Sequence, residues 1–473
     1  MKIKTSVVRI LFFVFSLGLT ACTSVSYQPV DSQLSSCLKT YQQLDRVIKK
    51  YHLQDAGVAR VEEYPFLRTT RFLASFTQVL NDSAHYKEWL NMLNAQAVDT
   101  LQQEARRLPD TVSVPSERTL LTCGDQLVSD LAMKARLKSQ LINEAAVPDS
   151  YRYWQRVVGL YPLTAVLFRF GILRDQKNLK QQGWPPLDAP PEGDYQFYSL
   201  NKSSGLDTPI FPLPVNSLGV PLLNSQLHSH LLSRYAPTVA TLSGHDFDRL
   251  GAPLSNGFSS DNPDFYSWID YGWFNGEVSL RLNYSIWFSE RPKDGAFDLF
   301  SGQLDGLTWR VHLTLSGKVL AWDSMHNCGC WYRLYPARGF SVKAEDALYR
   351  EPVYVAEPLT DYQEKVLYLE SGTHHILAVR DRTEEVAESE EVKGIQARLR
   401  PYAELKPYLF APSGLVLSSV RAERWLFWPM GVPSPGAMRV AGTHAIAFLG
   451  TRHFDDPFLL EDIGLVELSP IMQ

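Results

Sequence analysis

The chain has 473 residues and a formal net charge of −5 at neutral pH. Hydrophobic residues make up 45% of it and aromatic residues 12%, which is enough for a folded core and excludes an intrinsically disordered chain. Lysine and arginine are not in excess and form no basic patch, so the sequence gives no reason to expect nucleic acid as a partner. The length is typical of two or three domains.

Residues 1–21 predict an export signal. Lys2, Lys4 and Arg9 form a positive start, and the apolar run "ILFFVFSLGL" follows. That run is shorter than the roughly 20 residues that a membrane-spanning helix needs. It leads into Leu19-Thr20-Ala21-Cys22, and this segment resembles the lipobox of bacterial lipoproteins.

The resemblance implies that residues 1–21 are removed and that Cys22 carries acyl chains such as palmitate, with residues 22–30 as a lipidated tether. Several acyl chains anchor a protein firmly, at about 0.8 kcal/mol for each buried CH₂ group. In this family an aspartate after the cysteine often retains the protein at the inner membrane, and Thr23 stands there instead. We therefore expect a lipid-anchored protein of the outer membrane, facing the periplasm or exposed at the cell surface.

Residues 31–182 predict an α-helical domain. Apolar residues recur at helical spacing from Leu34 onward, and the same pattern continues to about residue 178. The most apolar stretch of the mature chain, "LYPLTAVLF" at 160–168, predicts a buried helix. Cys37 and Cys123 both fall in this half, and in an oxidising compartment a disulfide between them is the simplest interpretation. Two inert buried thiols are the alternative.

The spacing of the apolar residues changes from a helical period to alternation after a proline-rich linker at 183–195, "GWPPLDAPPEGDY". Residues 277–288 and 307–315 alternate between apolar and polar side chains, and "VLAWDS" at 319–324 completes a hairpin with the second of them. Further strand candidates are TVATL, KVLYLE, HHILAV, ERWLFW and HAIAFLG. The sequence therefore predicts an α+β protein, in which residues 196–473 form an antiparallel β-rich sandwich or barrel.

The stretch "HNCGCW" at 326–331 is the strongest chemical signal. In an extended chain His326, Cys328 and Cys330 share one face, and Gly329 lets the chain curl so that their side chains converge. An imidazole and two thiolates suit zinc or copper. Further ligands would come from other strands, and the candidates are His374, His375, His444 and His453.

Three alternatives to a metal site remain at this stretch. Cys328 and Cys330 could form a strained, redox-labile disulfide. One of them could be a nucleophile, although an oxidising compartment does not favour a catalytic thiolate. The stretch could also be a tight turn with two buried thiols. The usual zinc pattern places two or more residues between the cysteines, and here there is one.

Other polar residues are weaker candidates. His245, Asp246 and Asp248 could bind a metal or do acid–base work, but "GHDFDRLG" is also typical of a polar turn. Asp455 could orient His453 from the same face of an extended segment. Arg310 and His312 could line a cleft, although a solvated sheet face is the simpler interpretation of their alternation.

These patterns give two functional hypotheses. In the first, an envelope lipoprotein binds a transition metal through His326, Cys328 and Cys330; whether it is also an enzyme stays open. In the second, it is a non-catalytic binding or assembly module with a disulfide-pinned turn and an envelope-protein or cell-wall partner. The sequence has no GxSxG, Walker A, HExxH or dinucleotide-binding motif, which disfavours those enzyme classes.

Overall fold

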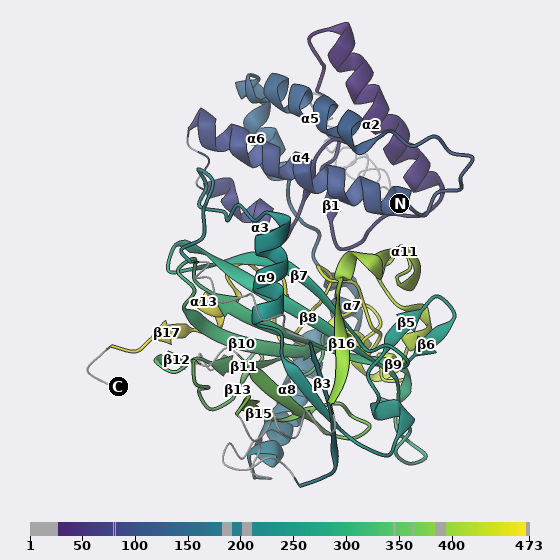
Figure 1. Ribbon diagram of the computed structural model, residues 1–473, viewed down its shortest axis with the longest axis vertical. Helices are drawn as coiled ribbons and strands as arrows, with labels where there is room; N and C mark the ends of the chain where they lie inside the picture. The colour runs from purple at the N-terminus through teal and green to yellow at the C-terminus, as the bar shows by residue number, and fades with distance from the viewer. Residues whose placement is uncertain are drawn as a thin grey trace, which may run out of the picture.

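The computed structural model describes residues 27–78, 80, 82–181, 192–200, 211–343, 347–361, 364–383 and 394–469. The predicted signal, Cys22 and most of the linker at 183–195 lie outside these residues. A group of helices stands at one end of the molecule, and a large curled sheet fills the rest (Figure 1). This arrangement confirms an α+β protein with a helical N-terminal part.

The helical part is built on four helices: α2 (Ser32–Lys50), α4 (Ser83–Ala105), α5 (Glu117–Ala132) and α6 (Ala135–Glu144). Asp31, Asp82 and Ser116 cap the first three through side chains that accept a backbone N–H bond, which satisfies a donor that the helix itself leaves unpaired. The core of this part contains Trp89 and Leu127, and it also takes in Val220 and Val278 from the β-rich part.

Cys37 on α2 and Cys123 on α5 form a disulfide, with their Cα atoms 5.1 Å apart. The predicted pairing is therefore confirmed. The bond joins positions separated by 86 residues and fixes α2 against α5. A crosslink across a long loop stabilises the fold chiefly by restricting the unfolded chain.

Two further helices, α7 (Tyr153–Val158) and α8 (Tyr161–Gln181), do not join that core. Arg156 donates from Nε to the Met430 carbonyl at 2.8 Å, and Arg169 donates to the Ala347 carbonyl at 2.9 Å, so these helices pack on the β-rich part. Figure 1 shows α8 beside the sheet and away from α2. No helix in the described ranges is long and apolar enough to cross a bilayer.

The expectation of a buried helix at 160–168 is wrong. Leu163 and Leu167 are 68% and 71% exposed, whereas Ala165 between them is buried. The segment is helical, but only one of its faces contacts the protein. The physical reason is that α8 lies at the surface with no element over its outer side in the described chain.

In the described part of the chain, eleven strands form one sheet in the order β13-β11-β10-β9-β8-β7-β16-β3-β4-β14-β15. Their bounds are β3 Tyr195–Leu200, β4 Thr238–Leu242, β7 Asp264–Phe274, β8 Glu277–Arg291, β9 Gly302–Leu313, β10 Val319–His326, β11 Arg333–Pro336, β13 Tyr354–Val355, β14 Lys365–Leu369, β15 Ile376–Asp381 and β16 Gly394–Pro401. Strand β16 runs parallel to both β3 and β7, so the sheet is mixed and the antiparallel prediction is only partly right.

Smaller elements complete the fold. The short strand pairs are β1 Ala59–Arg60 with β2 Arg68–Thr69, β5 Ala252–Leu254 with β6 Gly257–Ser259, and β12 Phe340–Val342 with β17 Leu465–Glu467. The short helices are α3 Arg71–Ala74, η1 Ser75–Gln78, α9 Ser225–Arg234, η2 Asp246–Asp248, η3 Tyr402–Glu404, α11 Lys406–Leu409, η4 Leu417–Ser419, α12 Arg424–Phe427, η5 Trp428–Met430 and α13 Leu459–Ile463.

The predicted hairpin is present, because β9 and β10 pair antiparallel with Val311 opposite Trp322. Two of the predicted strands are wrong. Residues 423–428 form α12 and the start of η5, and residues 444–450 run without a regular strand. The aromatic content of the first segment suggested a strand, but local propensity yields to tertiary packing in such short runs.

Both faces of β8, β9 and β10 are buried. Leu282, Tyr284 and Val311 on the apolar face belong to the main core, and Tyr284 donates to the Leu232 carbonyl of α9 at 2.8 Å. The polar face is buried as well. Arg310 and His312 are fully covered, so the expectation of a solvated face is wrong.

The polar face is covered by the C-terminal segment 437–456, to which it hydrogen-bonds. Arg310 binds Asp323 through Nε at 2.8 Å and donates to the Phe454 carbonyl at 2.6 Å. His312 lies 3.0 Å from the same Asp323 carboxylate. Because Arg310 is paired with Asp323 and its donors bind the carboxylate and a carbonyl, its charge tolerates removal from water.

Candidate functional site

The cysteine turn, residues 326–331, follows the end of β10. The Gly329 amide donates to the His326 carbonyl at 2.7 Å, and the His326 amide donates to the Cys330 carbonyl at 2.9 Å. Gly329 has φ 91°, and a Cβ atom there would lie 2.6 Å from the Ala445 carbonyl oxygen. Only glycine therefore fits this position.

The thiols of Cys328 and Cys330 are both free. Cys328 is buried, Cys330 is partly exposed, and the Cys330 amide lies 3.3 Å from the Cys328 sulfur. The disulfide alternative is therefore not what the structure holds. Burial opposes ionisation of Cys328, but the hydrogen bond from Cys330 and the charge of Arg421 bring its pKa below the usual value. The same hydrogen bond and burial raise the pKa of Cys330, so Cys328 ionises first.

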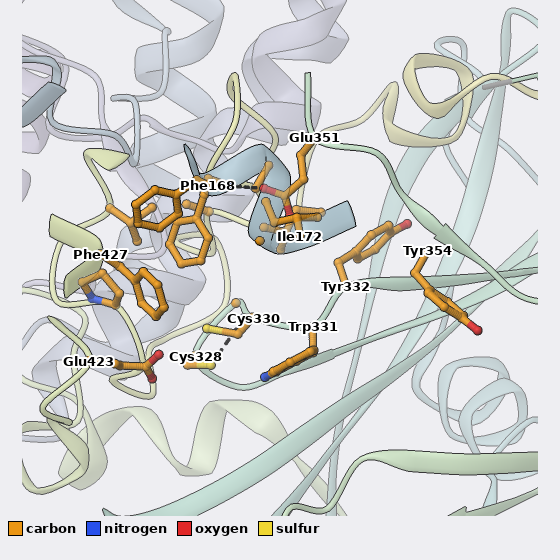
Figure 2. Close-up of a pocket in the computed structure, with 18 of the residues that line it drawn as sticks. Phe168, Ile172, Cys328, Cys330, Trp331, Tyr332, Glu351, Tyr354, Glu423 and Phe427 are labelled. Atoms are coloured by element: carbon orange, nitrogen blue, oxygen red, sulfur yellow. Dashed lines mark hydrogen bonds between the residues drawn. The ribbon is translucent and has the colours of Figure 1, made fainter. Parts of the chain in front are cut away.

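Both cysteines line a cavity of about 640 Å³. Figure 2 shows Phe168 and Ile172 of α8 opposite the cysteine turn, and Phe427 of α12 closing one side. The ring of Phe168 lies 5.4 Å from that of Phe427. The volume falls within the range of small-molecule sites, and most lining side chains are aromatic or aliphatic, as such sites require.

Two carboxyl groups lie in the cavity wall. Glu423 lies near Cys328, and burial raises its pKa to about 7. Glu351 accepts bonds from the amides of Phe448 and Leu449, at 2.5 and 3.2 Å, and burial raises its pKa as well. In Figure 2 the two carboxyl groups stand on different sides of the apolar lining. The cavity is therefore apolar with a small number of placed polar groups.

The structure brings three of the predicted metal ligands, His326, His374 and His375, together near Asp305, away from the two cysteines that line the cavity. His326 does not share a face with the cysteines: its Nδ1 lies 3.7 Å from Asp305, and its ring lies 5.0 Å from the ring of His375. His444 contacts the Asn327 carbonyl at 3.1 Å, and His453 contacts Asp149 at 3.0 Å. Burial lowers the pKa of His444 to about 3 and of His453 to about 4.

No group of three or more histidine, cysteine, aspartate or glutamate side chains is placed to hold a metal ion within the described ranges. Strand β10 ends at His326 and residues 327–329 form a turn, so the alternation of an extended strand does not carry from His326 to the cysteines. Zinc or copper binding stays a prediction.

Sequence reasoning missed a buried ionic cluster around Asp305. His374 contacts Asp305 through Nδ1 at 2.7 Å and lies 3.4 Å from Asp248 through Nε2, and its ring stacks on Phe288 at 3.8 Å. Although burial opposes it, the two carboxylates raise the pKa of His374. Arg421 donates to Asp305 at 3.0 Å and joins this cluster to the cysteine turn.

The remaining candidates have structural partners. Asp248 accepts bonds from the Ser371 hydroxyl at 2.5 Å and the Gly372 amide at 2.8 Å, which fixes the turn before β15. Asp246 lies 3.6 Å from Arg249, and the ring of His245 stacks on Phe247 at 4.8 Å. These three predicted residues therefore do not form one site.

Asp455 lies between the two parts of the protein. Its carboxylate is 3.7 Å from Arg71 of α3, and burial raises its pKa to about 6. It does not orient His453, whose partner is Asp149 on the segment before α7.

Comparison of the chain with protein-family models, with curated proteins and with solved structures finds no match. The function is therefore argued from the cavity and its surroundings alone.

Proposed function

We propose that the protein is an envelope lipoprotein, anchored to the outer membrane through Cys22, that binds an apolar molecule in the cavity above the cysteine turn. The observation that carries this proposal is the cavity itself, with its volume of about 640 Å³ and its predominantly aromatic and aliphatic lining. Burial of apolar ligand surface supplies roughly 25 cal/mol per Å² before the costs of association.

The polar groups restrict the chemistry of the ligand. Glu351 and Glu423 present carboxyl groups to the cavity, so an anionic group placed beside either of them would be repelled whenever they are ionised. Arg333 also lines the cavity, and its Nη1 donates to the Ile376 carbonyl at 2.8 Å. Because most of the other lining side chains are aromatic or aliphatic, the proposed ligand is a hydrocarbon chain or ring system whose buried portion is uncharged.

The free cysteines support a second candidate function. Two thiols that are separated by one residue and face the same cavity form a two-sulfur site, and thiolate ligands select monovalent copper. Each thiol would release its proton on binding, Cys328 first because its pKa is the lower of the two. This candidate keeps the predicted cysteine ligands and omits His326.

Probe binding tests the first candidate. Residues 23–473 would be exported without lipid and titrated with N-phenyl-1-naphthylamine, an uncharged apolar dye that fluoresces out of water. We expect saturation at one dye per chain. Ile172→Trp fills the cavity and should weaken binding about tenfold, a loss of about 1.4 kcal/mol. Leu163→Trp, on the outer face of α8, is the matched control and should bind as the parent does.

A dye that does not saturate, or one that binds both tryptophan variants equally, would contradict the proposed function.

Metal analysis with a free-thiol count on the same protein tests the second candidate. One copper per chain, lost in Cys328→Ser, would support it, and two free thiols without metal after incubation with copper(I) would reject it.

A further inference from the structure

A continuous apolar surface lies outside the cavity, on α7, α8 and α12. We define the docking surface by six side chains that are each more than half exposed: Trp154, Val157, Leu163, Leu167, Phe170 and Trp425. Soluble proteins seldom expose so many large apolar side chains together.

The three helices form one surface because they meet at η5. Gly159, between α7 and α8, lies against Pro429, where a Cβ atom on the glycine would be 2.5 Å from that of the proline. Phe168 of α8 contacts Phe427 of α12. The exposed apolar side chains are therefore carried by helices that pack against one another.

The outer face of α8 changes from apolar to basic along its length. Leu163, Leu167 and Phe170 are followed at helical spacing by Arg174 and Lys177, and all five side chains are exposed. Tryptophans lie beside this stripe, on α7 and α12. An apolar face with tryptophan beside it and basic residues next to it is typical of helices that lie in a membrane interface.

The docking surface is continuous with the cavity. Leu167 and Leu426 line the cavity, and both are also more than half exposed to the outside. A hydrocarbon group could therefore pass from the docking surface into the cavity along apolar side chains without crossing water.

We infer that the docking surface binds the interfacial region of a phospholipid bilayer, with Arg174 and Lys177 facing anionic headgroups, and that the cavity receives its ligand from that bilayer. The charge of these residues and the opening of the cavity at this surface favour a membrane over a second copy of the chain or a protein partner. The inference deepens the proposed function, because it names the source of the ligand.

Vesicle flotation tests the inference on residues 23–473, which lack the lipid anchor. The vesicles would contain phosphatidylethanolamine and phosphatidylglycerol. We expect the parent to float with them and Leu163→Asp/Trp425→Asp to lose at least about tenfold in partitioning. The control Met133→Asp/Leu254→Asp adds the same charge at exposed apolar positions on other elements, and it should float as the parent does.

Three results would overturn the inference: a parent that does not float, a double variant that floats as the control does, or a parent dimer that the double variant dissociates. The last result would identify the surface as an interface between copies. Dye binding without vesicles is measured in parallel, and we expect it to be unchanged in the double variant. If the parent floats with the vesicles but does not bind the dye, the proposed function is rejected and the membrane-binding inference stands. The two can be separated because flotation reports only on the docking surface.

Discussion

The two faces of strands β8–β10 are both removed from water, but by different interactions. On one face Leu282 and Val311 pack into the main core with no exposed surface. On the other, Arg310 and Asp323 are paired and Arg310 donates to the backbone of the C-terminal segment. Alternation along a strand therefore distinguished the apolar side from the polar side correctly, but it did not tell that both sides are buried.

The difference matters for function, because the C-terminal segment that covers the polar face also forms part of the cavity wall. Ala445 and Phe448 line the cavity, and Phe454 accepts the bond from Arg310. The polar face thus acts as the support on which the cysteine turn and the covering segment are held.

The largest effect is expected from breaking the ion pair on the polar face. Arg310→Met leaves the Asp323 carboxylate buried without its guanidinium, and we expect the free energy of unfolding to fall by about 3–5 kcal/mol. Urea denaturation measures the change. The paired variant Arg310→Met/Asp323→Leu should recover part of the loss, because it removes both charges. A loss below about 1 kcal/mol in the single variant would contradict the pairing described here.

The apolar face should respond to lost volume and not to charge. Leu282→Ala removes buried methyl groups and leaves a cavity, for an expected loss of about 3 kcal/mol in the same urea experiment. Leu282→Met, which keeps the volume, should cost less than about 1.5 kcal/mol. Equal losses in the two variants would show that this face is not closely packed.

A smaller effect is expected from Glu423, near the cysteine turn. Because burial raises its pKa to about 7, above the ordinary value of 4.5, the folded state binds this proton more tightly than the unfolded state does. Its contribution to stability is therefore complete below pH 4.5 and is lost as the pH rises through 7, by on the order of 3 kcal/mol.

Glu423→Gln should remove this part of the pH dependence. The measurement is the difference in unfolding free energy between parent and variant from pH 4.5 to 7.5, which cancels the contribution of Asp455, whose pKa is raised in the same direction. A difference that does not change with pH would mean that the Glu423 carboxyl is not buried in solution.

The spacing of apolar residues predicted helices and strands well where that spacing is regular. The helical spacing around Cys37, the alternation in β8 and the hairpin of β9 with β10 are all present. The cavity could not be predicted, because its walls come from segments near residues 168, 330, 351, 427 and 448, which only the fold brings together. The exposed side of α8 was missed because an apolar run suggests that the helix is buried, and the sequence does not show whether another element covers it.

The most direct test of the proposed function is organic extraction and mass spectrometry of residues 23–473 purified from a periplasm without detergent. We predict about one apolar molecule per chain in the parent, none or far less in Ile172→Trp, and the parental amount in Met133→Trp, whose exposed side chain lies away from the docking surface. The same small amount of extracted material in all three proteins would contradict a ligand-binding cavity.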